Sequence, residues 1–269
     1  MTTNSISFGG SVPQAYEEGL CPTVFAPYAL DLLERLAPSA GMRILETAAG
    51  TGAVTRVLLK GLPADAHLAV TDLNPAMIAV GQPLVGSDPR IEWREADAQA
   101  LPFDDASFDA LVCGFGVMFY PDKPLAMREA KRVLKSGGRM IFNVWDSFDV
   151  NAWARVTNEA LVELFPADPP PFLKTPFGYF DPAVIRAALT DAGFTDIQIE
   201  HVDKEAVCES AELFARGMVL GTPTSAQIQA RGTVDPQVVV ARVAERLAEL
   251  GGAAPHRSPI RAVVVSARA

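Results

Sequence analysis

The segment ILETAAGTG, residues 44–52, contains a short apolar run, one acid and then a turn of small residues. The apolar run that ends at Glu46 predicts a short strand, and residues 53–62 predict a helix. Gly50 and Gly52 permit backbone angles that a side chain forbids, so they suit a tight turn between the two elements. Such a turn lets a ligand approach the main chain and places the unpaired N–H groups of a helix beside it.

The same alternation of apolar runs and helical patterns continues to residue 146. Strands are predicted at residues 43–46, 67–71, 91–94, 108–113 and 139–145, and helices at 53–62, 75–85 and from Leu125 to the pair Gly137 and Gly138. Near-continuous apolar strands are typical of a parallel sheet that is covered on both faces. The order predicts an α/β fold with a doubly wound sheet and right-handed crossovers.

The rhythm changes after Asp146. The later chain predicts helices at residues 153–164 and 182–192, a strand at 195–202, a helical region at 208–250 with breaks near 221–223 and 232, and a last strand at 260–266. These two strands lack a βαβ rhythm, so we expect them to pair as an antiparallel edge. We predict one domain over 1–269, with an N-terminal helical cap (1–40), a core (41–146), and two substrate-side insertions (147–180 and 206–257) that roof the active site.

Composition excludes several classes of protein. Hydrophobic residues make up 49% of the 269 residues and charged residues 20%, which argues against wholesale disorder. The net charge of -9 gives no electrostatic footprint for nucleic acid. The longest apolar run, residues 110–120, is too short for a membrane span, which needs about 20 residues. Residues 1–10 lack a basic-then-apolar signal segment, so we expect a cytoplasmic protein.

The cysteines and histidines predict no metal site. Cys21, Cys113 and Cys208 are far apart and form no CxxC pair, so neither a zinc ribbon nor a disulfide framework is indicated. His67, His201 and His256 are isolated in the sequence. We interpret His201 and His256 as surface or structural histidines, because neither lies where a base after the fourth or fifth strand belongs.

Two further acids follow predicted strands. Asp72 stands 20 residues after Gly52, and an acid at about that offset bonds ribose hydroxyls in nucleotide-binding α/β folds. Asp97 follows the third strand, where a carboxylate can accept the exocyclic amine of adenine. Taken singly, Asp72 also suits a solvated strand end or a helix cap, and Asp97 a turn.

At this point the chain resembles the class I S-adenosylmethionine-dependent methyltransferases, in particular the small-molecule branch that includes ubiquinone and menaquinone biosynthesis enzymes. The matching stretches are residues 44–52, TDLNPAM (71–77), DAQALPF (97–103), SFD (107–109) and the segment 129–142 with its VLKSGGR core (133–139). The resemblance covers residues 40–146. It implies a Rossmann-like, mostly parallel seven-stranded sheet whose last strand is antiparallel. One departure is that Ala48 and Ala49 stand where the family often has Gly-Cys.

The resemblance implies S-adenosyl-L-methionine as the cofactor and gives roles to particular positions. Glu46 anchors the methionine amino group, Gly50 and Gly52 lie beneath the cofactor, and Asp72 holds the ribose diol. Leu73 and Met77 lie against the adenine, Asp97 and Ala98 read its edge, and Gly114 and Phe115 lie near the methionine moiety. The remaining predicted cofactor-binding residues are Ala48 and Thr51 of the turn and Tyr16, which closes over the methionine end.

The predicted activity is methyl transfer to a small, apolar or aromatic acceptor by in-line displacement, mainly through positioning. Aromatic residues in the segments around the predicted pocket, such as Trp145, Trp153 and Phe177, favour such an acceptor. Trp153 and Met218, each taken alone, are interpreted as packing residues. The segment 114–120 lacks the Asn/Asp-Pro-Pro-aromatic motif of enzymes that methylate amino groups of DNA.

Other readings stay open. The glycine turn and an acid 20 residues after Gly52 also suit an NAD-linked oxidoreductase. The dinucleotide-binding pattern of such an enzyme, however, has a third glycine at the position of Thr55. A catalytically silent protein that binds S-adenosylmethionine also fits the motifs. The sequence does not distinguish oxygen, nitrogen, carbon and sulfur acceptors, identifies no catalytic base, and leaves both monomer and homodimer open.

Overall fold

The computed structural model describes residues 12–269 and divides into two compact units. The sheet unit contains Tyr28–Ser147, Thr175–Asp203 and Arg261–Ala269. The helical unit contains Phe148–Lys174, Lys204–Ile260 and the described part of Met1–Pro27. The prediction of one domain over 1–269 stays a prediction. The predicted absence of a signal segment in 1–10, and the start of the predicted cap, lie outside the described residues.

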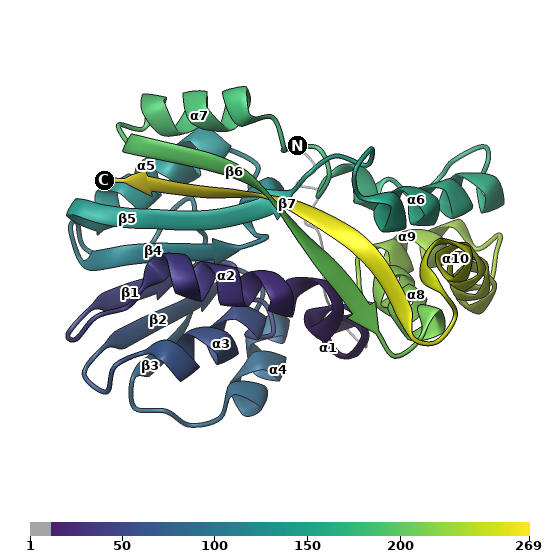
Figure 1. Cartoon of the computed structure of the whole chain (residues 1–269), viewed down its shortest axis with the longest axis horizontal. Helices are drawn as coiled ribbons and strands as arrows, with labels where there is room; N and C mark the ends of the chain where they lie inside the picture. Colours follow the sequence, from purple (N-terminus) through teal and green to yellow (C-terminus); the bar gives the residue numbers. More distant parts are fainter. Residues whose placement is uncertain (1–11) are drawn as a thin grey trace. The chain divides into compact units, whose positions relative to one another are not determined.

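One seven-stranded sheet forms the frame, in the order β3-β2-β1-β4-β5-β7-β6 (Figure 1). The strands are β1 (Arg43–Glu46), β2 (His67–Asp72), β3 (Ile91–Glu95), β4 (Phe108–Gly114), β5 (Leu134–Trp145), β6 (Thr195–Cys208) and β7 (His256–Arg268). Parallel pairing joins β3 to β2, β2 to β1, β1 to β4, and β4 to β5. The late strand β7 pairs antiparallel with β5. The predicted doubly wound sheet with a late antiparallel strand is confirmed.

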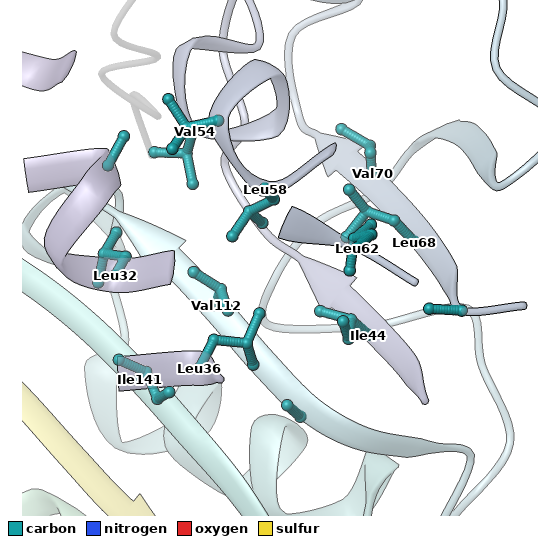
Figure 2. Packing of buried hydrophobic residues seen from close by; sticks show 14 residues of the cluster. Leu32, Leu36, Ile44, Val54, Leu58, Leu62, Leu68, Val70, Val112 and Ile141 are labelled. Atoms are coloured by element: carbon teal, nitrogen blue, oxygen red, sulfur yellow. The ribbon is translucent and has the colours of Figure 1, made fainter. Parts of the chain in front are cut away.

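Helices cover both faces of the first five strands. They are α2 (Ala26–Leu36), α3 (Ala53–Gly61), α4 (Pro75–Val85), α5 (Lys123–Val133) and α7 (Pro182–Asp191), with a short 3-10 turn at Val117–Phe119. Leu32 and Leu36 of α2 and Leu58 of α3 pack on Ile44 and Val112 of the sheet (Figure 2). Leu111, Met140 and Phe142, which alternate with these strand residues, are buried as well, so the second face is also covered.

The predicted end of the helix that contains Leu125, α5, was wrong. The helix ends at Val133 rather than at Gly137 and Gly138, because Leu134 adopts an extended conformation and pairs with Phe108 at the start of β5. Gly137, with a φ of 76°, lies where the pairing of β4 with β5 shifts register. A glycine in a strand often marks such an irregularity, and the local pattern resembles a helix C-terminus equally well.

The two late strands are longer than predicted. β6 continues from residue 202 to Cys208, and β7 begins at His256 rather than 260. The charged run Asp203-Lys204-Glu205 conceals the strand in the sequence. In the structure, Asp203 pairs with Arg261 at 2.7 Å and Glu205 with Arg257 at 2.7 Å, and such cross-strand pairs support an exposed edge.

The helical unit contains the helices predicted in the two insertions. It comprises α1 (Val12–Gly19), a π-helical turn (Cys21–Phe25), α6 (Ala152–Leu164), a 3-10 turn (Phe172–Lys174), α8 (Ala211–Leu220), α9 (Thr224–Arg231) and α10 (Pro236–Gly251). α8 packs against α1 and α10, and α6 packs against α10. Trp153 lies 5.5 Å from Phe214, ring centre to ring centre, and Met218 is buried, as expected of packing residues. Within residues 12–269, no helix is long and apolar enough to cross a membrane.

Candidate functional site

The carboxyl ends of β1, β2 and β4 meet at one edge of the sheet. β1 is the shared neighbour, because Glu46 is in register with Val70 of β2 and with Val112 of β4. The parallel order therefore brings Glu46, Asp72 and Gly114 to the same edge, where open α/β sheets bind ligands. The structure brings these three predicted residues together from positions that are distant in the sequence.

The glycine turn after β1 is fixed by main-chain bonds to both neighbouring strands. Thr47 N–H donates to Val112 O at 3.0 Å, and Ala49 N–H donates to Thr71 O at 3.0 Å. Gly50 and Gly52 have φ angles of 59° and 79°, in the left-handed region that favours glycine. A Cβ on Gly52 would lie 2.7 Å from Val85 Cγ2, so this position also needs the space.

Ala48 occupies the same left-handed region, with a φ of 53°. This is where the sequence departs from the Gly-Cys of the resembled family, and the backbone there still has the conformation that glycine prefers. Room for its methyl group comes from Gly116, since a Cβ on Gly116 would lie 2.4 Å from Ala48 Cβ. The prediction did not include Gly116, because nothing local in the sequence links it to the turn.

Glu46 is a buried acid, and one of its two carboxylate oxygens has no hydrogen-bond partner among the described residues. Its side chain is almost inaccessible, and Thr55 Oγ1 donates to Oε2 at 2.7 Å. Oε1 is buried and has no hydrogen-bond partner among the described residues. Burial raises the pKa of Glu46 to about 8, although the bond from Thr55 opposes the shift. A buried carboxylate oxygen without a partner is a ready acceptor for a cationic donor.

Asp72 holds the two sides of the turn together. Its Oδ2 accepts from Gly50 N–H at 2.7 Å and its Oδ1 from Asn74 N–H at 2.8 Å. Burial raises the pKa of Asp72, and the two backbone bonds oppose the increase. The cap of α4 is Asn74, which accepts from Ala76 N–H at 2.9 Å, so Asp72 is not itself that cap. Each oxygen of Asp72 keeps acceptor capacity for a hydroxyl group.

The predicted adenine-side residues follow β2 and β3. Ala96 N–H donates to Asp72 O at 3.0 Å, which ties the loop that carries Asp97 and Ala98 to the end of β2. Asp97 Oδ1 accepts from Gln99 N–H at 2.8 Å, a turn geometry that leaves further acceptor capacity on the carboxylate. Leu73 is 63% exposed, whereas Met77 is buried close to Gly50.

Phe115, directly after β4, lies in an aromatic cluster. Its φ is 56°, and its N–H donates to Asn143 Oδ1 at 2.9 Å. The Phe115 ring stacks on Trp145 at 4.1 Å, and Tyr28 meets it edge-on at 5.4 Å. Asn143 is fully buried, and its Nδ2 has no hydrogen-bond partner within the described part of the chain. Asn143 was not among the predicted residues, although a lone amide inside the apolar strand β5 is a sequence signal that could have identified it.

Tyr120 connects the loop after β4 to the glycine turn. Its hydroxyl donates to Thr47 Oγ1 at 3.1 Å and lies 3.3 Å from Cys113 Sγ. Desolvation raises the pKa of Tyr120, so the hydroxyl stays protonated and able to donate. The sequence offered no signal for this contact, since Tyr120 and Thr47 are 73 positions apart.

The remaining predicted residues fall into different surroundings. Thr51 is buried, and its carbonyl accepts from Arg56 Nη1 at 3.0 Å. Tyr16 lies on α1 in the helical unit, where its ring stacks on Phe25 at 5.1 Å. Its predicted role over the cofactor stays a prediction, and so does the roofing of the active site by the insertions. No cluster of three or more His, Cys, Asp or Glu suited to a metal ion occurs within residues 12–269.

His201 and His256 lie in different surroundings. His256 is buried in the helical unit, 3.1 Å from Ser258 Oγ and 5.4 Å from the Phe214 ring, so it packs as a structural residue. His201 of β6 lies in the sheet unit with Nδ1 2.8 Å from Asp146 Oδ2. Asp146 directly follows β5, so the pair lies at the carboxyl end of that strand.

The core of the chain matches known methyltransferases. Residues 45–142 match the family model described as a methyltransferase domain. A demethylmenaquinone methyltransferase from Clavibacter sepedonicus is 42% identical over 106 residues, which are 39% of this chain and 42% of that protein. The ubiquinone/menaquinone biosynthesis C-methyltransferase UbiE from Bartonella tribocorum is 42% identical over 102 residues, 37% of this chain and 39% of that protein. The chain thus spans about two fifths of the length of these relatives.

Among solved structures, the fold is similar to phosphoethanolamine N-methyltransferase 2 from Haemonchus contortus in complex with S-adenosyl-L-methionine. The TM-score is 0.62 at 16% identity, and the match covers 100% of this chain and 61% of that one. At this identity the likeness shows the fold alone. The sequence matches confirm that the core resembles the class I methyltransferases, and in particular the ubiquinone and menaquinone enzymes.

Proposed function

We propose that this chain is an S-adenosylmethionine-dependent methyltransferase that acts on a small, apolar or aromatic acceptor. The observation that carries the proposal is the buried, unpartnered Oε1 of Glu46 beside a glycine turn that Asp72 closes. The methyltransferase domain matched at residues 45–142 includes all of these residues.

The residues fit the cofactor in three respects. Glu46 Oε1 supplies a buried negative partner for the methionine ammonium group. The backbone at Gly50 and Gly52 leaves the turn without side chains where the cofactor approaches. The acceptor capacity left on Asp72 suits a ribose diol, and a charge-assisted bond of this kind contributes about 1.5–3 kcal/mol.

The chain's own part in the reaction is mainly alignment. When bound, S-adenosylmethionine supplies a methyl group on a positively charged sulfur atom, which needs no further activation. Glu46 and Asp72 hold two ends of the ligand in fixed positions, and Tyr120 and Asn143 hold the loops on which those positions depend. Fixed alignment of reacting groups lowers the barrier by several kcal/mol.

The two alternative functions fare differently. An oxidoreductase with a dinucleotide fingerprint needs a glycine at residue 55 for close packing of helix on strand. Thr55 is buried there and donates to Glu46, which gives the position a different task. A silent S-adenosylmethionine-binding protein has the same cofactor residues as an enzyme, since fold and cofactor site do not by themselves establish a reaction.

Calorimetry with S-adenosylmethionine tests the cofactor. We expect binding by the wild-type protein and at least tenfold weaker binding by Asp72→Ala, with a cost set by the lost charge-assisted bond. Asp65→Ala is the matched control, because Asp65 is an exposed acid in the loop before β2. Absence of binding by the wild type, or equal binding by Asp72→Ala, refutes the assignment.

Methyl transfer is tested separately. Methyl-labelled S-adenosylmethionine is incubated with the protein and a metabolite extract, and labelled products are identified by mass spectrometry. Incorporation into an apolar or aromatic metabolite supports the proposal. Cofactor binding without any labelled product supports the silent alternative.

A further inference from the structure

His201 and Asp146 form a pair that has no task in the cofactor site described above. Asp146 Oδ2 lies 2.8 Å from His201 Nδ1, and Asp146 Oδ1 accepts from Ser147 N–H at 2.7 Å. The Asp146 side chain is 8% exposed, whereas the imidazole of His201 is 48% exposed. A buried carboxylate that bonds an accessible imidazole fixes the tautomer and the orientation of the ring.

The pair lies next to the aromatic cluster at the end of β4. Trp145, which precedes Asp146, stacks on Phe115. By a second route, the Tyr28 hydroxyl donates to Val202 O at 2.9 Å, and the Tyr28 ring meets Phe115 edge-on. Phe115 follows Gly114 at the same sheet edge as Glu46, so the pair occupies the β5 side of the candidate site.

The geometry also selects the nitrogen that can react. A carboxylate acceptor at 2.8 Å places the proton of a neutral imidazole on Nδ1. Nε2 then carries the lone pair, and no described residue is its hydrogen-bond partner. An imidazole with this arrangement is able to act as a general base.

We propose that His201 is the general base of the methyl transfer, that Asp146 is its positioning residue, and that the acceptor reacts through an aromatic hydroxyl group. The inference rests on the proposed function. A phenol keeps its hydroxyl proton at neutral pH and therefore needs a base to remove it, whereas a thiolate or a neutral amine attacks without a base.

The step balances as a single displacement. The hydroxyl proton moves to His201 Nε2, and the electron pair it leaves makes the oxygen, or a ring carbon conjugated with it, nucleophilic. That atom forms the bond to the methyl carbon as the carbon–sulfur bond breaks, and the sulfur keeps that electron pair. Where a ring carbon is the attacking atom, it then releases its own hydrogen to water as a proton, the electron pair of that carbon–hydrogen bond restores the aromatic ring, and the oxygen takes a proton back. The imidazolium, stabilised by Asp146, returns its proton to water.

Several charged and titratable groups lie near His201. Asp146 contacts it from the end of β5, and Asp203, on its own strand, interacts with it electrostatically. Arg261 of β7 interacts with both of these acids, and Tyr28 of α2 bonds the carbonyl of the next residue, Val202. Arg261 and Asp203 neutralise each other through bonds of 2.7 and 3.0 Å. Removal of Asp146 should therefore change the tautomer of the imidazole more than removal of Asp203 or Arg261.

The first test observes the imidazole directly. With only three histidines in the chain, nitrogen NMR of the wild-type protein resolves His201 once His67→Gln and His201→Gln have assigned the signals. We expect a protonated Nδ1 and an unprotonated Nε2 in the neutral ring, and loss of this preference in Asp146→Asn. A neutral ring protonated on Nε2 overturns the proposal, whatever the state of the cofactor assignment.

The second test measures transfer of labelled methyl to the metabolite extract from pH 6 to 9. His201→Gln should lose at least 100-fold in rate at neutral pH, as general bases contribute about 10²–10⁴-fold, and should recover only where the acceptor itself ionises. Asp146→Asn should lose rate and shift the pH profile. His67→Gln, altered at the amino end of β2, should behave as the wild type.

Calorimetry with S-adenosylmethionine distinguishes a failure of the role given to His201 from a failure of the proposed function. His201→Gln should bind S-adenosylmethionine with unchanged Kd, and a selective loss of transfer then supports the proposal. A variant that transfers methyl at the wild-type rate with the wild-type pH profile overturns it. If the wild-type protein binds the cofactor but transfers no label, the proposed function is refuted, and the role given to His201 is refuted with it.

Discussion

Glu46 makes cofactor binding depend on pH in a way that the structure specifies. Burial raises the pKa of this carboxyl group to about 8, so at neutral pH it is mostly protonated before any ligand binds. A methionine ammonium at Oε1 requires the ionised form and lowers the pKa of Glu46 in the complex. Binding therefore releases a proton below pH 8, and affinity rises with pH as the group ionises.

The magnitude follows from the ionised fraction. With a pKa of about 8, Glu46 is about 1% ionised at pH 6 and about 10% ionised at pH 7. Kd should fall about ninefold between these two pH values, with release of about 0.9 proton per ligand at pH 7. The range stays below pH 7.7, where an α-amino group begins to lose its own charge.

The assay is calorimetry in two buffers with different ionisation enthalpies, which measures proton release, at pH 6 and pH 7. Glu46→Gln keeps an acceptor oxygen but has no proton to lose, so it should show neither the release nor the change in Kd. Asp65→Ala should show both. A wild-type Kd that is equal at the two pH values, or equal proton release by Glu46→Gln and the wild type, refutes the reasoning.

Three further predictions concern the supports of the site. Tyr120→Phe removes the hydroxyl that donates to the buried Thr47 hydroxyl. It should lower the free energy of unfolding, measured by urea titration, by about 1–2 kcal/mol and weaken cofactor binding. An unchanged urea midpoint contradicts the role given to the Tyr120 hydroxyl. Gly116→Ala puts a methyl 2.4 Å from Ala48 Cβ and 2.7 Å from Cys113 Sγ and should cost about 1–3 kcal/mol. The added change Ala48→Gly removes the first of these clashes and should restore part of the loss in thermal denaturation, whereas a double variant no more stable than Gly116→Ala argues against that clash. Asn143→Ala removes the side-chain acceptor of Phe115 N–H but keeps the Asn143 main-chain acceptor at 3.2 Å, so it should cost about 0.5–1.5 kcal/mol and weaken cofactor binding. Urea titration and calorimetry measure these effects, and wild-type values in both would show that the Asn143 side chain does not hold this loop.

Residues 43–114 show how far local patterns reach. β1, α3, β2 and α4 begin and end within one or two residues of the predicted bounds, because apolar periodicity, glycine turns and an Asn-Pro cap are properties of neighbouring residues. Local patterns failed at α5, where a strand register decided that Leu134 is extended, and at β6, where pairing with β7 supports a charged run.

The sequence by itself determined the βα order, the acids at the strand ends and the glycine turn, since each depends on residues that are close along the chain. Only the tertiary structure decided which buried atoms lack partners and which distant residues meet. Glu46 Oε1 is left over because Thr55 takes the other oxygen, and Tyr120 reaches Thr47 because β1 and β4 are neighbours. His201 meets Asp146 for the same physical reason: side-chain contacts between strands depend on sheet order and register, which no local pattern encodes.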